Sequence, residues 1–198
     1  MPLLDGQVGI VSGAAQGLGT AFAKVLSENG AQVVAFDVQQ SVTDVVKEIE
    51  DATGNKVLGM VADVSMRADV ESVVATAVET FGGIDVLVNN AGTWKRTPVD
   101  TPWAQAVADW DAIMDTNFKG VLMLSRACVP HLISRGGGNI VNVSTYYVLP
   151  ARSKGTNPPD TDLYNASKWA LNGFTQAWSR HLAVHKIRVN GLCMGATD

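Results

Sequence analysis

Near its amino terminus the chain reads VGIVSGAAQGLGTAFAKVL over residues 8–26. The apolar run 8–11 is typical of a buried strand, and apolar residues recur at helical spacing between Leu18 and Leu26. Three glycines at the spacing GxxxGxG separate these two patterns: Gly13, Gly17 and Gly19. The stretch therefore predicts a strand, a tight glycine turn and a helix, in that order.

The same alternation of short apolar runs and helical patterns continues along the chain. Strands are predicted at residues 8–11, 31–36, 56–61, 84–88, 139–143 and 187–192. Helices are predicted at 18–26, 41–54, 70–81 and 110–135, and from about residue 162. Residues 93–109, with two prolines and two tryptophans, are expected to form an irregular surface excursion that walls a pocket.

Strands that alternate with helices through right-handed crossovers form a parallel sheet with helices on both faces. We therefore expect an α/β fold with a doubly wound parallel sheet of six strands in three αβα layers. The length of 198 residues, with 46% hydrophobic and 17% charged residues, suits a single domain over 1–198 with a full core.

Charge and composition exclude several classes of protein. Fifteen Lys and Arg against nineteen Asp and Glu give a net charge of -4, so we expect no nucleic-acid partner. No basic leader precedes a long apolar run, and no apolar run has the length of a membrane span, so we expect neither a signal peptide nor membrane association. Two cysteines, Cys128 and Cys193, without metal-ligand spacing predict no metal site and a cytoplasmic location.

The glycine turn is a candidate phosphate site. Glycines let the main chain approach a pyrophosphate, and the helix that follows directs free amide groups at its charge. The alternative is that these glycines only pack a tight turn. Asp37, at the end of the second predicted strand, favours the phosphate site, because its carboxylate can bind the ribose diol of a dinucleotide and would repel a 2'-phosphate. Lys24 is the one basic residue between Val8 and Asp37, so we expect NAD to be preferred over NADP.

Tyr164 and Lys168 are candidate proton-transfer residues. They lie four residues apart in a predicted helix, so both side chains project from one face. A neighbouring ammonium favours the phenolate, which makes the tyrosine oxygen a usable acid or base near neutral pH. An exposed helix pair without catalytic function has the same spacing.

Four motifs together resemble those of the classical short-chain dehydrogenase/reductase family, and the likeness covers essentially the whole chain. They are Ser12-Gly13 through Gly19, Asn89-Asn90-Ala91-Gly92, Asn117, and Tyr164-Asn165-Ala166-Ser167-Lys168. The resemblance implies a Rossmann-like fold that binds a nicotinamide dinucleotide. It also implies a homotetramer or homodimer packed through the helices near 117–135 and 162–184.

The resemblance assigns roles to individual residues. Tyr164 is the expected acid/base, Lys168 is expected to hold the nicotinamide ribose and lower the tyrosine pKa, and Asn117 is expected to anchor a water in a proton relay. The expected cofactor-binding residues are Gly13, Gln16, Gly17, Leu18, Gly19, Asp37, Asp63, Val64, Asn90, Ala91, Gly92, Tyr164 and Lys168.

The chain departs from the family pattern in three places. Thr145 takes the place of the substrate-orienting serine, with Ser144 as the alternative. About six extra residues separate Thr145 from Tyr164 and imply an inserted loop, within 150–162, that either shapes specificity or is neutral. Met194 replaces a proline, and relatives continue beyond Asp198 with substrate-covering helices and a further strand that this sequence lacks.

These patterns predict an NAD-dependent oxidoreductase that transfers a hydride between nicotinamide and a secondary alcohol or ketone. Trp94 and the residues Tyr146, Tyr147 and Leu149 favour an apolar or cyclic substrate, although each aromatic ring can equally be core filling. The alternative is a dinucleotide sensor or scaffold that has lost catalysis. A nucleotide-sugar dehydratase or epimerase is disfavoured, because such relatives usually carry GxxGxxG at the first turn.

Overall fold

The computed structural model describes residues 2–149 and 160–195. Its sheet has six parallel strands in the order β3-β2-β1-β4-β5-β6. The strands are β1 Val8–Ser12, β2 Gln32–Asp37, β3 Val57–Val61, β4 Val86–Asn89, β5 Gly138–Thr145 and β6 Ile187–Met194. The expected doubly wound parallel sheet is confirmed, and its order reverses between β1 and β4.

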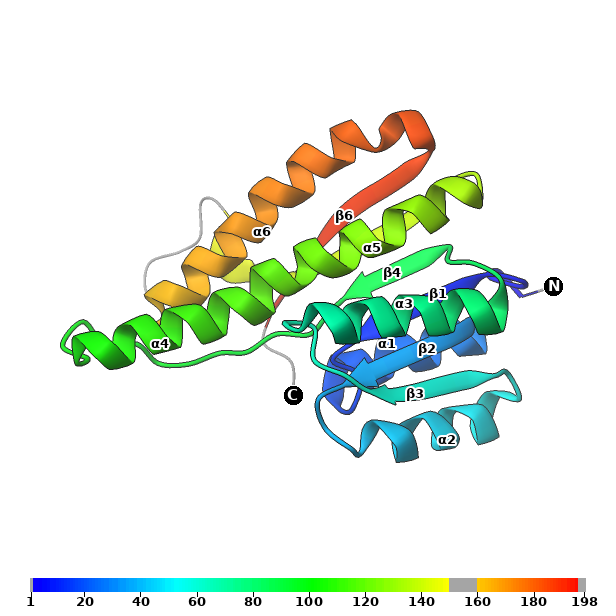
Figure 1. Ribbon diagram of the computed structural model, residues 1–198, viewed down its shortest axis with the longest axis horizontal. Coiled ribbons are helices and arrows are strands. Elements are labelled where there is room, and N and C mark those ends of the chain that lie inside the picture. The colour runs from blue at the N-terminus through cyan, green and yellow to red at the C-terminus, as the bar shows by residue number, and fades with distance from the viewer. Residues whose placement is uncertain (1, 150–159, 196–198) are drawn as a thin grey trace.

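Helices cover both faces of the sheet and complete three layers (Figure 1). Helices α1 Gly17–Glu28 and α2 Val42–Thr53 pack on one face, where the core includes Val11, Val33 and Val88. Helices α3 Arg67–Phe81, α5 Val121–Ser134 and α6 Asp162–His181 pack on the other face, over Ile10, Leu87 and Ile140. Successive strand residues point to opposite faces, so apolar runs without polar interruption supply both cores.

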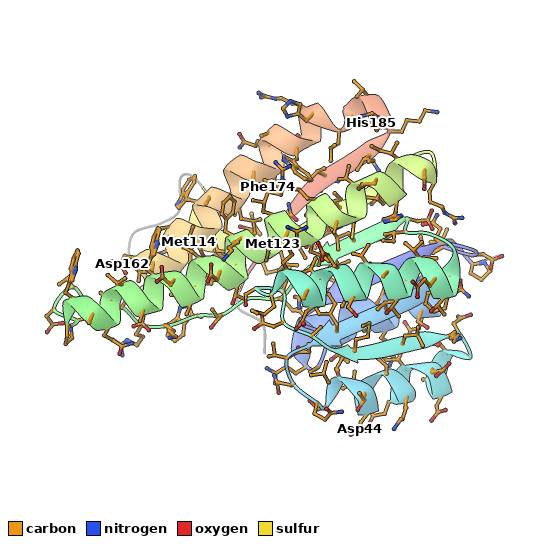
Figure 2. All side chains as sticks on the ribbon, in the orientation of Figure 1. Asp44, Met114, Met123, Asp162, Phe174 and His185 are labelled. Atoms are coloured by element: carbon orange, nitrogen blue, oxygen red, sulfur yellow. The ribbon has the colours of Figure 1, made fainter. Side chains whose placement is uncertain are left out.

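The region after β4 differs from the sequence-based expectation. Only its first part is irregular, because helix α4 begins at Trp103, directly after Pro102, and runs to Met114. The expected helix 110–135 is three consecutive segments: the end of α4, a π-helical turn at Asp115–Gly120, and α5. Met114, labelled in Figure 2, marks where the wider turn starts.

Strand β4 begins two residues later than predicted. Asp85 lies just before this strand. Its carboxylate accepts a hydrogen bond from the N–H of Val8 (2.9 Å) and forms an ion pair with Arg135 (3.0 Å). Its side chain therefore ties the start of the sheet to the end of α5.

Neither a membrane span nor a metal cluster is found within the described ranges. No helix there is long and apolar enough to cross a membrane. No three His, Cys, Asp or Glu side chains there are grouped as metal ligands, and Cys128 and Cys193 are both free.

Candidate active site

A cavity of about 890 Å³ lies at the carboxyl ends of the strands, where β1 and β4 are neighbours. In doubly wound folds ligands bind at such a reversal of strand order. All the expected cofactor-binding residues other than Tyr164 and Lys168 line this cavity: Gly13, Gln16, Gly17, Leu18, Gly19, Asp37, Asp63, Val64, Asn90, Ala91 and Gly92. The structure thus brings together residues from four strand ends.

The glycines of the first turn have different physical roles. A Cβ on Gly19 would lie 1.9 Å from the carbonyl oxygen of Gly13, so this glycine is required for the turn to pack against the helix. Gly17 has a φ of +56°, and a Cβ there would meet nothing within 4 Å. The packing interpretation therefore holds for Gly19, whereas Gly17 leaves open space at the cavity.

The amino terminus of α1 is free to receive an anion. Its first backbone hydrogen bond runs from Thr20 N–H to the carbonyl of Gln16, so the preceding amides have no helical acceptor. The first turn contains no acidic residue, and no side chain caps it. These bare N–H groups and the space beside Gly17 fit a pyrophosphate.

Asp37 is held in a fixed orientation beside the glycine turn. One carboxylate oxygen accepts from the N–H of Ala15 and the other from the N–H of Gln39, both at 3.0 Å. Asp37 as a whole is 8% exposed, and the adjacent lining residues are Val38 and Gln39, which carry no charge. A diol therefore meets an ordered acceptor, whereas a phosphate meets a negative charge with no cation beside it.

Ser12 joins the glycine turn to the segment after β4, a contact that the sequence motifs alone did not reveal. Its hydroxyl oxygen accepts from the N–H groups of Asn90 and Ala91, both at 3.0 Å. The amide of Asn90 donates in return to the carbonyls of Ser12 (3.1 Å) and Gly13 (2.9 Å). These bonds fix two sides of the cavity relative to each other.

A second, smaller cavity of about 240 Å³ adjoins the first and contains the expected reactive side chains. Thr145, Tyr164 and Lys168 line it, together with Trp94, Leu18 and Met194. Leu18, Asn90, Gly92 and Thr93 line both cavities, so the two are continuous. Tyr147 packs edge to face on Tyr164, with ring centroids 6.5 Å apart, whereas Tyr146 and Leu149 do not line either cavity. Most of the expected inserted loop lies outside the described residues.

Both proton-transfer candidates have pKa values shifted toward their neutral forms. Burial raises the pKa of Tyr164, and a hydrogen bond with the Thr145 hydroxyl opposes part of that rise. Burial lowers the pKa of Lys168 to about 8. Its ammonium donates to the carbonyl of Val143 (2.8 Å) and lies 5.8 Å from the Tyr164 ring centroid. Lys168 is not among the causes of the Tyr164 shift, so the expectation that it lowers the tyrosine pKa stays a prediction.

The hydroxyls of Thr145 and Ser144 have different hydrogen-bond partners. The hydroxyl of Ser144 donates to the side-chain oxygen of Asn172 on α6 (3.1 Å) and is occupied there. The hydroxyl of Thr145 contacts Tyr164 and also accepts from the N–H of Tyr147 (3.4 Å). Both hydroxyls line the smaller cavity with Tyr164, and Thr145 is the one that contacts the tyrosine.

Asn117 lies in the π-helical turn and is fully buried. Its side-chain oxygen accepts from Thr93 N–H (2.7 Å), and its amide nitrogen donates to the Thr93 carbonyl (2.9 Å) and the Ser167 hydroxyl (3.0 Å). Because the side chain is occupied by protein partners, any water that this residue anchors has to bind its main chain. Ser167, which the motif contained without a role, connects α6 to the π-helical turn.

An α/β sheet with an uncapped helix terminus at the strand reversal, beside a half-buried Tyr and a buried Lys and Thr, is typical of a dinucleotide-binding oxidoreductase. The chain matches the family model "short chain dehydrogenase" over residues 7–198, and it belongs to that family. The family uses a nicotinamide dinucleotide, and the fit of the cavity agrees with it.

Individual relatives agree with this assignment. The chain is 37% identical to the 3-oxoacyl-[acyl-carrier-protein] reductase FabG of Thermotoga maritima, over 97% of this chain and 74% of that protein. It is 36% identical to dehydrogenase/reductase SDR family member 4 of Bos taurus, over 97% of this chain and 66% of that protein. A crystal structure from Sinorhizobium meliloti 1021, assigned as a short-chain alcohol dehydrogenase, has a TM-score of 0.85 and 34% identity, and covers 97% of this chain and 73% of that one.

Proposed function

We propose that the protein transfers a hydride between NAD and a secondary alcohol or ketone, with Tyr164 as the general acid/base. The observation that carries this proposal is the continuity of two cavities, one with Asp37 and the bare α1 terminus, the other with Thr145, Tyr164 and Lys168. A cofactor that spans both would bring its reactive end to the tyrosine. The bound cofactor supplies the hydride chemistry, and the protein supplies orientation and proton transfer.

Residues of the larger cavity would hold the dinucleotide. The α1 terminus and Gly17 would bind the pyrophosphate, Asp37 would accept hydrogen bonds from the adenosine ribose hydroxyls, and Asp63 and Val64 would bind the adenine. Asn90, Ala91 and Gly92 form the floor of the site. The ordered carboxylate of Asp37 without a neighbouring cation supports the preference for NAD over NADP.

Thr145, Tyr164 and Lys168 divide the proton chemistry. Thr145 donates a hydrogen bond to the substrate oxygen, and the Tyr164 hydroxyl exchanges a proton with the same oxygen. Lys168 has further N–H donors beyond the one that Val143 occupies, and these suit the hydroxyls of the nicotinamide ribose. Asn117 completes the proposed relay through a water on its main chain.

The protonation state of Tyr164 makes the rates of alcohol oxidation and ketone reduction depend on pH in opposite ways. Because burial raises the pKa of Tyr164, the phenol is protonated at neutral pH and is ready to donate a proton to a ketone. Alcohol oxidation needs the deprotonated form, so its rate rises as the pH increases toward the tyrosine pKa.

The smaller cavity favours a substrate with an apolar substituent. Trp94 and Leu18 line it, and Met194 lies among the same lining residues. Tyr147 supports the Tyr164 ring from the side. Secondary alcohols with an aromatic or cyclic group therefore fit better than small polar ones.

The test combines cofactor binding with turnover. Calorimetry with NAD and NADP on a native-length protein is followed by a panel of alcohols and ketones monitored at the nicotinamide absorbance. We expect tighter binding of NAD, turnover of some secondary alcohol, and at least a hundredfold loss of kcat in Tyr164→Phe with the NAD dissociation constant unchanged. NAD binding without turnover across the panel would instead favour a dinucleotide sensor or scaffold.

Two further proposals concern the setting of the enzyme. We infer a homodimer or homotetramer packed through α5 and α6, supported by the oligomers usual in the family and by Trp169, which is 54% exposed on α6. The two free cysteines support a reducing, cytoplasmic location. Sedimentation of the native-length protein and fractionation of its host test these proposals.

A further inference from the structure

The segment 93–97, here called the strap, leaves β4 and passes beside the smaller cavity. Its first residue, Thr93, is attached to Asn117 by two hydrogen bonds, of 2.7 and 2.9 Å. The amide of Asn117 also donates to Ser167 on α6 (3.0 Å). One end of the strap is therefore linked to the second turn of α6 through a single buried side chain.

The other end of the strap is attached to the first turn of α6. The N–H of Thr97 donates to the carbonyl of Asp160 (2.7 Å), and its hydroxyl donates to the carboxylate of Asp162. Thr97 is 4% exposed. Asp162, labelled in Figure 2, is the first residue of α6.

These two attachments close a ring of covalent and hydrogen bonds. The strap forms one side of the ring, the start of α6 forms the other, and Asn117 and Thr97 make the two cross-links. Trp94 lies between the cross-links on the strap, and Tyr164 lies between them on α6. Both residues line the smaller cavity, so the ring sets their separation.

We propose that Thr97 is a positioning residue that fixes the gap between Trp94 and Tyr164 and thereby selects alcohols with a flat apolar substituent. The inference rests on the proposed function, because it concerns the substrate of the same site. Thr97 acts through the two residues it spaces and does not itself line either cavity.

Neighbouring contacts of the strap are less suited to this role. Arg96 forms an ion pair with Asp160 (2.8 Å), but its side chain is 63% exposed, and exposed ion pairs contribute little. Lys95 pairs with the buried Asp109 of α4 (2.7 Å), which holds the strap to α4 and not to the helix that carries Tyr164. The hydrogen bond from the buried Thr97 hydroxyl to a charged acceptor is the stronger type of contact.

The first experiment compares 1-phenylethanol with 2-propanol as substrates of the native-length enzyme. In Thr97→Val, which keeps the shape and removes the hydroxyl, we expect the kcat/KM ratio of the two alcohols to fall about tenfold, through a higher KM for 1-phenylethanol. NAD affinity and the pH profile stay as in the wild type. Thr97→Ser restores the ratio, and Thr80→Val, an exposed threonine of α3, leaves it unchanged.

A double-mutant cycle with Trp94→Ala tests the coupling. If the ring acts through Trp94, Thr97→Val has little further effect once the indole is absent, so the two substitutions are not additive. Additive effects, or an unchanged alcohol ratio in Thr97→Val, would overturn the inference.

Hydrogen exchange provides a readout that needs no turnover. Amides within 160–168 are expected to exchange about tenfold faster in Thr97→Val than in the wild type or in Thr97→Ser, because one buried hydrogen bond is lost. Unchanged exchange contradicts the ring. A wild-type enzyme that turns over no alcohol or ketone of the panel contradicts the proposed function instead, and the exchange comparison then decides on the ring alone.

Discussion

At the scale of single residues, burial decides the protonation of the candidate catalytic groups. Lys168 is 5% exposed, and its charge is compensated by the carbonyl of Val143. Tyr164 loses solvent and gains the Thr145 hydroxyl as a partner. Burial therefore keeps the phenol of Tyr164 protonated at neutral pH, whereas Lys168 stays charged until the pH approaches 8.

The lowered pKa of Lys168 predicts a pH-dependent contribution to stability. The pKa is about 8 in the folded chain against an ordinary lysine value of 10.5, so the unfolded chain binds more protons between these pH values. Below pH 8 the full cost of burying the charge is present, and it is relieved as the pH rises through this window. Relative to Lys168→Met, the wild-type free energy of unfolding should increase by up to about 3 kcal/mol over the window. Urea denaturation of both proteins at several pH values measures this, and parallel pH profiles would contradict it.

Asp37 carries the prediction on cofactor choice. Asp37→Ser removes the ribose acceptor and the charge that repels a 2'-phosphate. We expect NAD affinity to fall about tenfold and NADP affinity to rise by a similar factor. Calorimetry measures both, and Asp51→Ser, at an exposed position of α2, serves as the control. An unchanged NAD to NADP ratio would show that Asp37 only orders the turn through Ala15 and Gln39.

At the scale of elements, the turn before α1 depends on a glycine for packing. Gly19→Ala puts a methyl group on the Gly13 carbonyl, which the turn can relieve only by moving. We expect a loss of about 2 kcal/mol or more in the free energy of unfolding. Gly173→Ala on α6, where a Cβ meets nothing within 4 Å, should stabilise by about 0.5–1 kcal/mol. Thermal and denaturant unfolding distinguish them, and equal effects would contradict the packing argument.

Elements with a strong periodic pattern could be predicted from the sequence, and those that depend on distant contacts could not. The strands were identifiable because both faces are buried, which leaves apolar runs such as 33–36. The first part of helix α4, residues 103–109, was missed because Pro98 and Pro102 indicated a loop, although Pro102 only precedes the helix. The π-helical turn could not be predicted from local sequence, because it goes with contacts between Asn117 and two residues far from it in the chain, Thr93 and Ser167.

The candidate site shows the same division. The glycine turn, Asp37 and the spacing of Tyr164 and Lys168 are local patterns, and the structure brings them to one cavity system. The different partners of Ser144 and Thr145 could not be predicted, because Asn172, which binds Ser144, lies on another element. The direction of the Tyr164 pKa shift could not be predicted from motif spacing, because it depends on how the surrounding residues bury the phenol.

At the scale of the whole molecule, the carboxyl ends and the amino ends of the strands differ in their contacts. Both cavities lie at the carboxyl ends of the strands. At the amino ends, Asp85 binds Val8 and Arg135. Asp85→Ala leaves the buried N–H of Val8 without its acceptor, so we expect a loss of about 1–3 kcal/mol in unfolding free energy. NAD affinity, measured well below the melting temperature, should not change. Weaker NAD binding in this variant would mean that the two ends of the strands are coupled.

The joining of β1 to β4 also constrains the order of events during folding. The bond between Ser12 and Asn90 links residues 78 positions apart, and β1 has no other neighbour on that side. A loop of this length must close before the glycine turn can contact the segment that begins at Asn90, and closure over long separations slows folding. Strands β1 to β3 leave the ribosome before β4, so one side of β1 stays unpaired until β4 arrives, and an unpaired strand of this kind is a site for misassociation of the nascent chain.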